Sequence, residues 1–130
     1  MPFEPIIIAY TKTPRAPVLA AMYIQAKYGQ AIEIVFTSAF MAEAGWDPET
    51  TKIGVSEGTG ADSRLFQLAP APTGYTLSKR GDKGEASIKM SVVVLRRHTA
   101  QPGKRSLQAV DFHRFGSTVT VNLQDFVEPI

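Results

Sequence analysis

The stretch that decides the fold is VLAAMYIQAKYGQAIEIVFT, residues 18–37. Its first ten residues alternate, so that every second side chain falls on one face: Val18, Ala20, Met22, Ile24 and Ala26. A period of two residues is typical of a β-strand. Residues 31–37 are rich in β-branched and aromatic side chains, which strands favour. With Tyr28-Gly29-Gln30 as the turn between them, the two segments predict a β-hairpin.

Three more pairs of strand-like segments follow along the chain. They are 51–56 with 64–68, 75–79 with 86–95, and 107–115 with 118–123. Each pair brackets a stretch that contains glycine, and Gly116-Ser117 suits a type II′ turn because glycine comes first. Hairpins at this spacing are typical of small all-β domains. We therefore predict one domain, 1–130, of the mainly β class: a small β-barrel or two packed antiparallel sheets built from hairpins.

One short α-helix is predicted over residues 38–44. Ser38 can cap it by accepting a hydrogen bond from a first-turn N–H. Phe40, Met41 and Ala44 form an apolar stripe, and Gly45 fits the position after the helix, where a left-handed residue is usual. A helix of about two turns needs packing to be stable, so the stripe is expected to face the core.

Residues 1–17 form a Pro-rich N-terminal arm, because Pro2, Pro5, Pro14 and Pro17 prevent a helix there. We expect at most one short strand in it, near Pro5 to Tyr10. The apolar residues of the predicted strands and helix supply the expected core: Met22, Ile24, Ile32, Ile34, Phe36, Phe40, Leu65, Leu68, Ile88, Val92, Val94, Leu107, Val119 and Val121.

The composition excludes several kinds of site. The chain contains no cysteine, which excludes disulfides, thiolate nucleophiles and cysteine-ligated zinc. No segment reaches the roughly 20 apolar residues of a membrane helix. The first nine residues lack the basic start of a signal peptide. We therefore expect no membrane association and a cytoplasmic location.

The positive charge is concentrated in one segment. The chain has a net charge of +2, whereas residues 79–105 hold eight basic and two acidic residues, a net +6. Two basic clusters flank an expected loop at 96–105, and a third lies in the neighbouring hairpin turn. Such clusters neutralise nucleic-acid phosphates, and the predicted contacts are Arg80, Lys83, Arg96, Arg97, Lys104 and Arg105. A solvated loop without a partner is the alternative explanation.

No arrangement of residues predicts catalysis. Residues 54–58 match the GxSxG pattern of serine hydrolases, with Asp111 and His113 later in the chain. That pattern needs a strand, a sharp turn and a helix, whereas here a glycine-rich turn and another strand follow. His98 and His113 are the only histidines, and no carboxylates stand at the helical spacing of a metal site. We expect that the protein is not an enzyme and that it binds no cofactor and no metal ion.

Residues 31–68 resemble the AbrB/SpoVT-type swapped-hairpin proteins. The shared unit is a strand, a short helix ending in an apolar residue and glycine, a tight turn and a hairpin, here 31–37, 38–44, 45–49 and 51–56 with 64–68. The resemblance implies a dimeric β-barrel and, for many members, DNA binding as regulators or antitoxins. The chain departs from the family at Thr50-Thr51, where Gly-Asp is usual, and in placing its basic residues at 79–105.

Charge and resemblance together predict a non-enzymatic nucleic-acid-binding accessory or regulatory protein that forms a homodimer. Bases of single strands stack on aromatic side chains, but no aromatic residue lies between Tyr75 and Phe112. We therefore expect phosphate contacts and no specialisation for single strands. The alternative function is a protein-binding module, an inhibitor or an assembly component, that acts through strand edges and the N-terminal arm.

Overall fold

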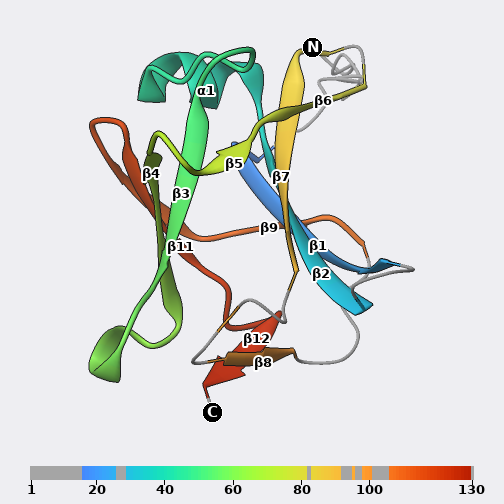
Figure 1. Ribbon diagram of the computed structural model, residues 1–130, viewed down its shortest axis with the longest axis vertical. Coiled ribbons are helices and arrows are strands. Elements are labelled where there is room, and N and C mark those ends of the chain that lie inside the picture. The colour runs from blue at the N-terminus through green and yellow to red at the C-terminus, as the bar shows by residue number, and fades with distance from the viewer. Residues whose placement is uncertain are drawn as a thin grey trace, which may run out of the picture.

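Two five-stranded antiparallel sheets face each other in the computed structural model of the protein (Figure 1). The structure describes residues 16–25, 29–81, 83–91, 95, 98–100 and 106–129. The mainly β class is confirmed, with packed antiparallel sheets and one short helix. The strand expected within the N-terminal arm, near Pro5 to Tyr10, lies outside the described residues.

The first sheet is built around the hairpin predicted from residues 18–37. Its strands β1 (Val18–Gln25) and β2 (Gly29–Phe36) pair along their whole length, so this prediction is confirmed. The strand order is β6-β7-β2-β1-β9. The other three strands are β6 (Ser78–Arg80), β7 (Glu85–Ser91) and β9 (Gln108–Ala109).

The second sheet contains two further predicted hairpins, in the strand order β10-β11-β4-β3-β5. Gly116 has a φ of 64° at the first position of the two-residue turn between β10 and β11, as a type II′ turn requires. A short 3₁₀ helix, η1 (Gly60–Asp62), lies in the longer connection between β3 and β4. The strands are β3 (Lys52–Glu57), β4 (Leu65–Pro70), β5 (Tyr75–Thr76), β10 (Phe112–Phe115) and β11 (Thr118–Asn122).

The chain passes from one sheet to the other at both lateral edges. Leu77, which is buried, is the single residue between β5 and β6. Val110 and Asp111 connect β9 to β10 in the same way. Because each of these links joins edge strands of different sheets, the sheets enclose one core between them.

A two-stranded sheet lies at one end of the molecule and the helix at the other (Figure 1). Its strands are β8 (His98–Ala100) and β12 (Val127–Pro129). The expected loop at 96–105 therefore contains a strand, which the isolated sequence could not show because β12 is remote in the chain. The expected strand at 107–115 is two strands, since the backbone changes sheet at Val110 and Asp111.

Helix α1 (Ser38–Ala44) forms over the predicted residues, but its N-terminal cap is not the predicted one. Thr37 is extended and its hydroxyl accepts a hydrogen bond from the Phe40 N–H at 3.3 Å, so Ser38 is the first helical residue. The prediction of Ser38 as the cap was wrong by one position because both residues carry a suitable hydroxyl. Gly45 adopts the left-handed conformation with a φ of 73°, as predicted.

An aromatic cluster packs helix α1 against the end of the core. Phe36 and Phe40 stack with ring centroids 5.6 Å apart, and Trp46 meets both rings edge-on. The Trp46 Nε1–H donates a 2.9 Å hydrogen bond to the carbonyl oxygen of Ser117, in the β10–β11 turn. The cluster therefore ties the first sheet, the helix and the β10–β11 hairpin together.

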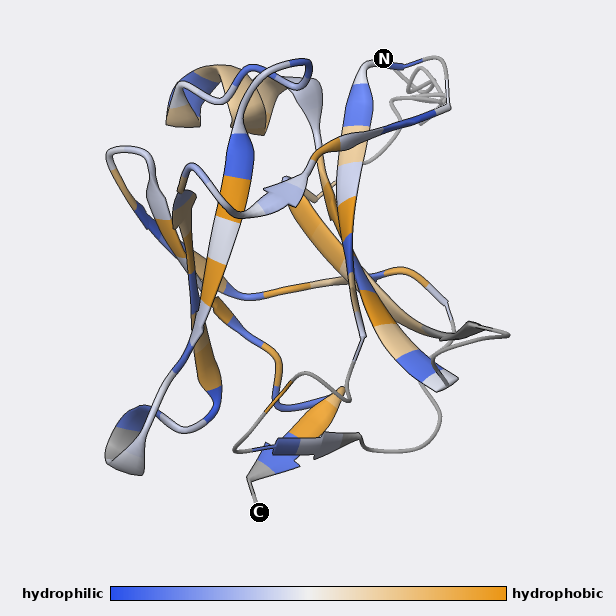
Figure 2. Ribbon diagram, in the orientation of Figure 1, coloured by the Kyte–Doolittle hydropathy of each residue, from blue (hydrophilic) through white to orange (hydrophobic). Residues whose placement is uncertain are grey.

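The core contains most of the predicted residues whose side chains are described. Apolar and polar residues alternate along β3 (Figure 2). Leu65 and Leu107 are only half-buried, so their prediction as core residues was wrong. Leu65 and Leu68 are three positions apart and so point to opposite faces of a strand; Phe66 is the buried neighbour. The predicted core side chains Ile24, Val92 and Val94 lie outside those that the structure describes.

The segment 71–74 crosses over β3 to reach its other side. Ile53 pairs with Pro70 of β4 on one side and with Tyr75 of β5 on the other. The crossing is close: a Cβ on Gly74 would lie 2.3 Å from the carbonyl carbon of Ile53. A Cβ on Gly54 would likewise meet the Ala71 Cβ at 2.9 Å. Only glycine fits at position 74, because the atoms that a Cβ would meet there belong to the backbone of Ile53 and Gly54.

We predict that Gly74→Ala lowers the free energy of unfolding by about 2–3 kcal/mol, because the added methyl group forces the crossing away from β3. Urea denaturation followed by circular dichroism measures the change. Gly60→Ala is the control: Gly60 has a φ of +59° but open space around its Cβ position, so the loss should be only about 1 kcal/mol. Equal losses in both variants would contradict the close crossing.

Candidate binding surfaces

The β6–β7 hairpin carries the described part of the basic segment. Arg80 pairs with Glu85, which leaves residues 81–84 as the turn, and Gly81 and Gly84 have positive φ values of 67° and 78°. A Cβ on Gly84 would lie 3.2 Å from the Ser38 Cβ, so the turn packs against the start of α1. Lys79 and Lys83 are exposed on this hairpin. Its basic side chains therefore project from the helix end of the molecule.

Arg80 is held by an acidic group of the neighbouring strands. Its Nε lies 3.5 Å from Glu33 Oε2, and the Ser87 hydroxyl donates a 2.9 Å hydrogen bond to the same oxygen. The Arg80 side chain is 37% exposed and that of Glu33 17%. The ion pair partly compensates the charge of Arg80. Among the described residues, no acidic side chain pairs with Lys79 or Lys83.

The structure does not bring the hairpin turn to the described part of residues 96–105. The turn precedes the first residue of β7, whereas β8 lies at the opposite end of that strand (Figure 1). A strand of seven residues spans about 23 Å. Of the six predicted contacts, Arg80 and Lys83 are described, and Arg96, Arg97, Lys104 and Arg105 lie outside the described residues.

His98 is buried at the start of β8, between the two basic clusters in sequence. It is 3% exposed and its ring lies 4.8 Å from that of Phe66. Nδ1 is 2.6 Å from Glu57 Oε2, and Nε2 is hydrogen-bonded to the carbonyl oxygen of Ser63. A carbonyl oxygen only accepts hydrogen bonds, so Nε2 carries a hydrogen.

These contacts of His98 were not predicted from the sequence. Its two polar partners are 41 and 35 residues away in the chain, so no local pattern relates them. They fix β8 to the end of β3 and to the turn after η1. His98 thereby fixes β8 to the second sheet.

The residues of the GxSxG match do not form a catalytic group. Ser56 is an exposed residue within β3 and pairs with Gln67 of β4. Gln67 pairs with Thr120, and Thr120 pairs with His113. Two strands therefore separate Ser56 from His113, a distance of about 14 Å across the sheet. The described residues also contain no group of three or more acidic or histidine side chains that could hold a metal ion.

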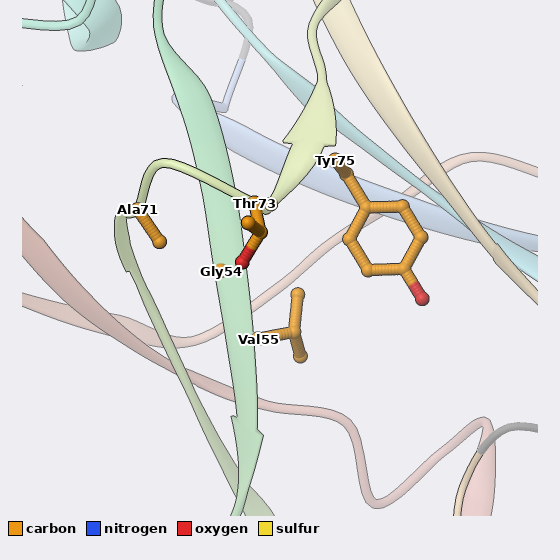
Figure 3. A pocket seen from close by; sticks show the side chains of 6 residues that line it. Gly54, Val55, Ala71, Thr73 and Tyr75 are labelled. Carbon is orange, nitrogen blue, oxygen red and sulfur yellow. The ribbon is translucent and has the colours of Figure 1, made fainter.

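A hollow of about 410 Å³ lies beside β3, where segment 71–74 crosses it (Figure 3). Its lining residues carry no charge: Gly54, Val55, Ala71, Thr73, Gly74 and Tyr75. Burial raises the pKa of the Tyr75 phenol above its ordinary value. A smaller hollow of about 220 Å³ lies on the outer face of the second sheet, between Ser56, Gln67 and the η1 segment.

Comparisons of the chain with known protein families, with curated proteins and with solved structures find no match. The order of strand, helix and hairpin in residues 31–68 is the expected one. Membership of the AbrB/SpoVT-type family remains a prediction. No helix in the described part of the chain is long and apolar enough to cross a membrane.

We predict that His98→Ala lowers the free energy of unfolding by about 3 kcal/mol, because it removes a buried ring that is hydrogen-bonded to Glu57 and Ser63 and packed against Phe66. His113→Ala is the matched control, since His113 is exposed on β10 and its loss should change stability by less than about 0.5 kcal/mol. Chemical denaturation of both variants measures the difference. A His98 variant as stable as the His113 variant would show that the buried contacts contribute nothing.

Proposed function

We propose that the protein is a non-enzymatic nucleic-acid-binding accessory or regulatory protein that contacts phosphates through its basic segment, residues 79–105. The observation that supports this proposal is the net +6 charge within 27 residues of a chain whose total is +2. The described part of that segment presents Lys79 and Lys83, exposed and without an acidic partner among the described residues, on one hairpin.

The side chains favour contacts to phosphates over contacts to bases. A lysine ammonium group neutralises a phosphate as a point charge and releases condensed counterions, which gives affinity without sequence preference. The exposed aromatic residues Phe112 and Phe115 lie on β10, an edge strand of the second sheet, whereas Lys79 lies on β6 of the first. Stacking of single-stranded bases requires both kinds of side chain in one groove. A duplex backbone therefore suits the hairpin better.

The ion pair to Glu33 gives Arg80 a different role from the lysines beside it. Because its guanidinium group is already engaged at 3.5 Å, a phosphate would have to share it with the carboxylate. Lys79 and Lys83 are therefore the main contacts of the hairpin in this proposal. Arg96, Arg97, Lys104 and Arg105 would supply a second set of contacts. We further propose a homodimer, as the family resemblance implies, which would double the number of contacts.

We predict binding to a random-sequence DNA duplex that weakens steeply between 50 and 200 mM salt, by about tenfold to a thousandfold for several phosphate contacts. Fluorescence anisotropy measures it for the wild type, for Lys79→Ala/Lys83→Ala and for Arg96→Ala/Arg97→Ala/Lys104→Ala/Arg105→Ala. Each lost contact should lower the slope of log affinity against log salt by about one. The control is Lys52→Ala/Arg64→Ala, which removes two exposed cations outside the basic segment.

Three results would contradict the proposal. One is the absence of binding at 50 mM salt, and another is an affinity that salt does not change. The third is an equal loss of affinity in the control, because that would make the total charge of the protein responsible and not the segment 79–105.

A further inference from the structure

One edge of β3 is only partly covered. On one side, β4 pairs with β3 from Ile53 to Glu57. On the other side, β5 contributes only two residues, which pair with Lys52 and Ile53. If that register continued, Gly74 would lie opposite Gly54 and Thr73 opposite Val55, but both residues belong to the segment that crosses over β3. Among the described residues, no strand faces Val55 on this side.

The hydrogen-bond pattern shows which main-chain groups point to this open edge. The Ala71 N–H donates to the Lys52 carbonyl and the Gly58 N–H to the Leu65 carbonyl, each at 2.9 Å. In an antiparallel pair, hydrogen-bonded residues alternate with residues whose N–H and C=O point away. The even-numbered residues of β3 therefore bond to β4. The N–H and C=O of Val55 point away from β4, toward the open edge.

The open edge coincides with the hollow of about 410 Å³ beside β3. Figure 3 shows Val55, Thr73 and the Tyr75 ring around it. Its volume of about 410 Å³ is within the range of ligand sites. Gly54 and Gly74 add no side chains that could block it.

The lining determines the chemistry of the ligand. None of the described lining residues has a charged side chain, which favours an uncharged ligand over a phosphate or a metal ion. An unpaired main-chain N–H and C=O on a strand edge can form hydrogen bonds with another extended backbone. The side chains of Val55 and Ala71 and the ring of Tyr75 form the apolar part of the lining, which suits a small apolar side chain beside that backbone.

We propose that the open edge of β3 binds an extended, uncharged peptide segment of a partner protein, which lies in line with β5 and antiparallel to β3. The main chain of the peptide exchanges hydrogen bonds with Val55, and one small apolar side chain enters the hollow. This function is separate from nucleic-acid binding. It assigns a definite site to the alternative class of function, a protein-binding module that uses strand edges.

Val55→Pro tests the proposal because it removes only the N–H that points to the open edge. Proline is tolerated on an edge strand where its nitrogen faces away from the ladder. Val55→Ala is the matched control, since it shortens the side chain but keeps the N–H. The probe is a phage-displayed library of random heptapeptides, selected on the wild type. The selected peptides are then measured against each variant by calorimetry, after circular dichroism has shown that the variant is folded.

We expect uncharged peptides with a small apolar residue at the centre, and an affinity about tenfold lower for Val55→Pro than for Val55→Ala. Thr73→Trp, which fills the hollow and leaves the backbone of β3 unchanged, should abolish binding, and it replaces Val55→Pro as the test if that variant does not fold. No enrichment above background, or equal binding to wild type and the folded variants, would overturn the proposal. DNA binding by the same variants should be unchanged, which separates this proposal from the nucleic-acid one.

Discussion

The close passage of segment 71–74 over β3 is the constraint on which the two-sheet arrangement depends. It moves the chain from the β4 side of β3 to the β5 side, and from there Leu77 leads it into β6 of the other sheet. Without that step, β6 and β7 could not continue from the second sheet into the first. The passage is possible because Gly74 lies against the backbone of Ile53. The same step takes Thr73 away from Val55 and leaves the edge of β3 open.

Different interactions close the two ends of the molecule. At one end, the rings of Phe36, Phe40 and Trp46 bury the end of the core under α1. At the other end, the buried His98 joins β8 to β3 through Glu57. The basic hairpin turn packs at the helix end. The basic hairpin turn and β8 therefore lie at opposite ends of β7.

The sequence predicted what depends on neighbouring residues. Alternation identified the β1–β2 hairpin, and Gly45 and Gly116 marked a helix end and a turn because each needs a positive φ. What depended on remote residues was not predictable. The partners of His98, the pairing of β8 with β12 and the ion pair of Arg80 with Glu33 all join distant parts of the chain. The crossing over β3 was also missed, since Pro70, Pro72 and Gly74 indicate a break in the strand but not its direction.

The open edge follows from the hydrogen-bond pattern of β3, which amide hydrogen exchange measures residue by residue. Gly54 and Ser56 donate to β4 in this arrangement, whereas the Val55 N–H faces the open edge. We predict that the Val55 amide exchanges about a hundredfold faster than both neighbours under native conditions. Equal protection of the three amides would contradict the crossing, because it would mean that a strand covers Val55 on the side that Thr73 leaves open.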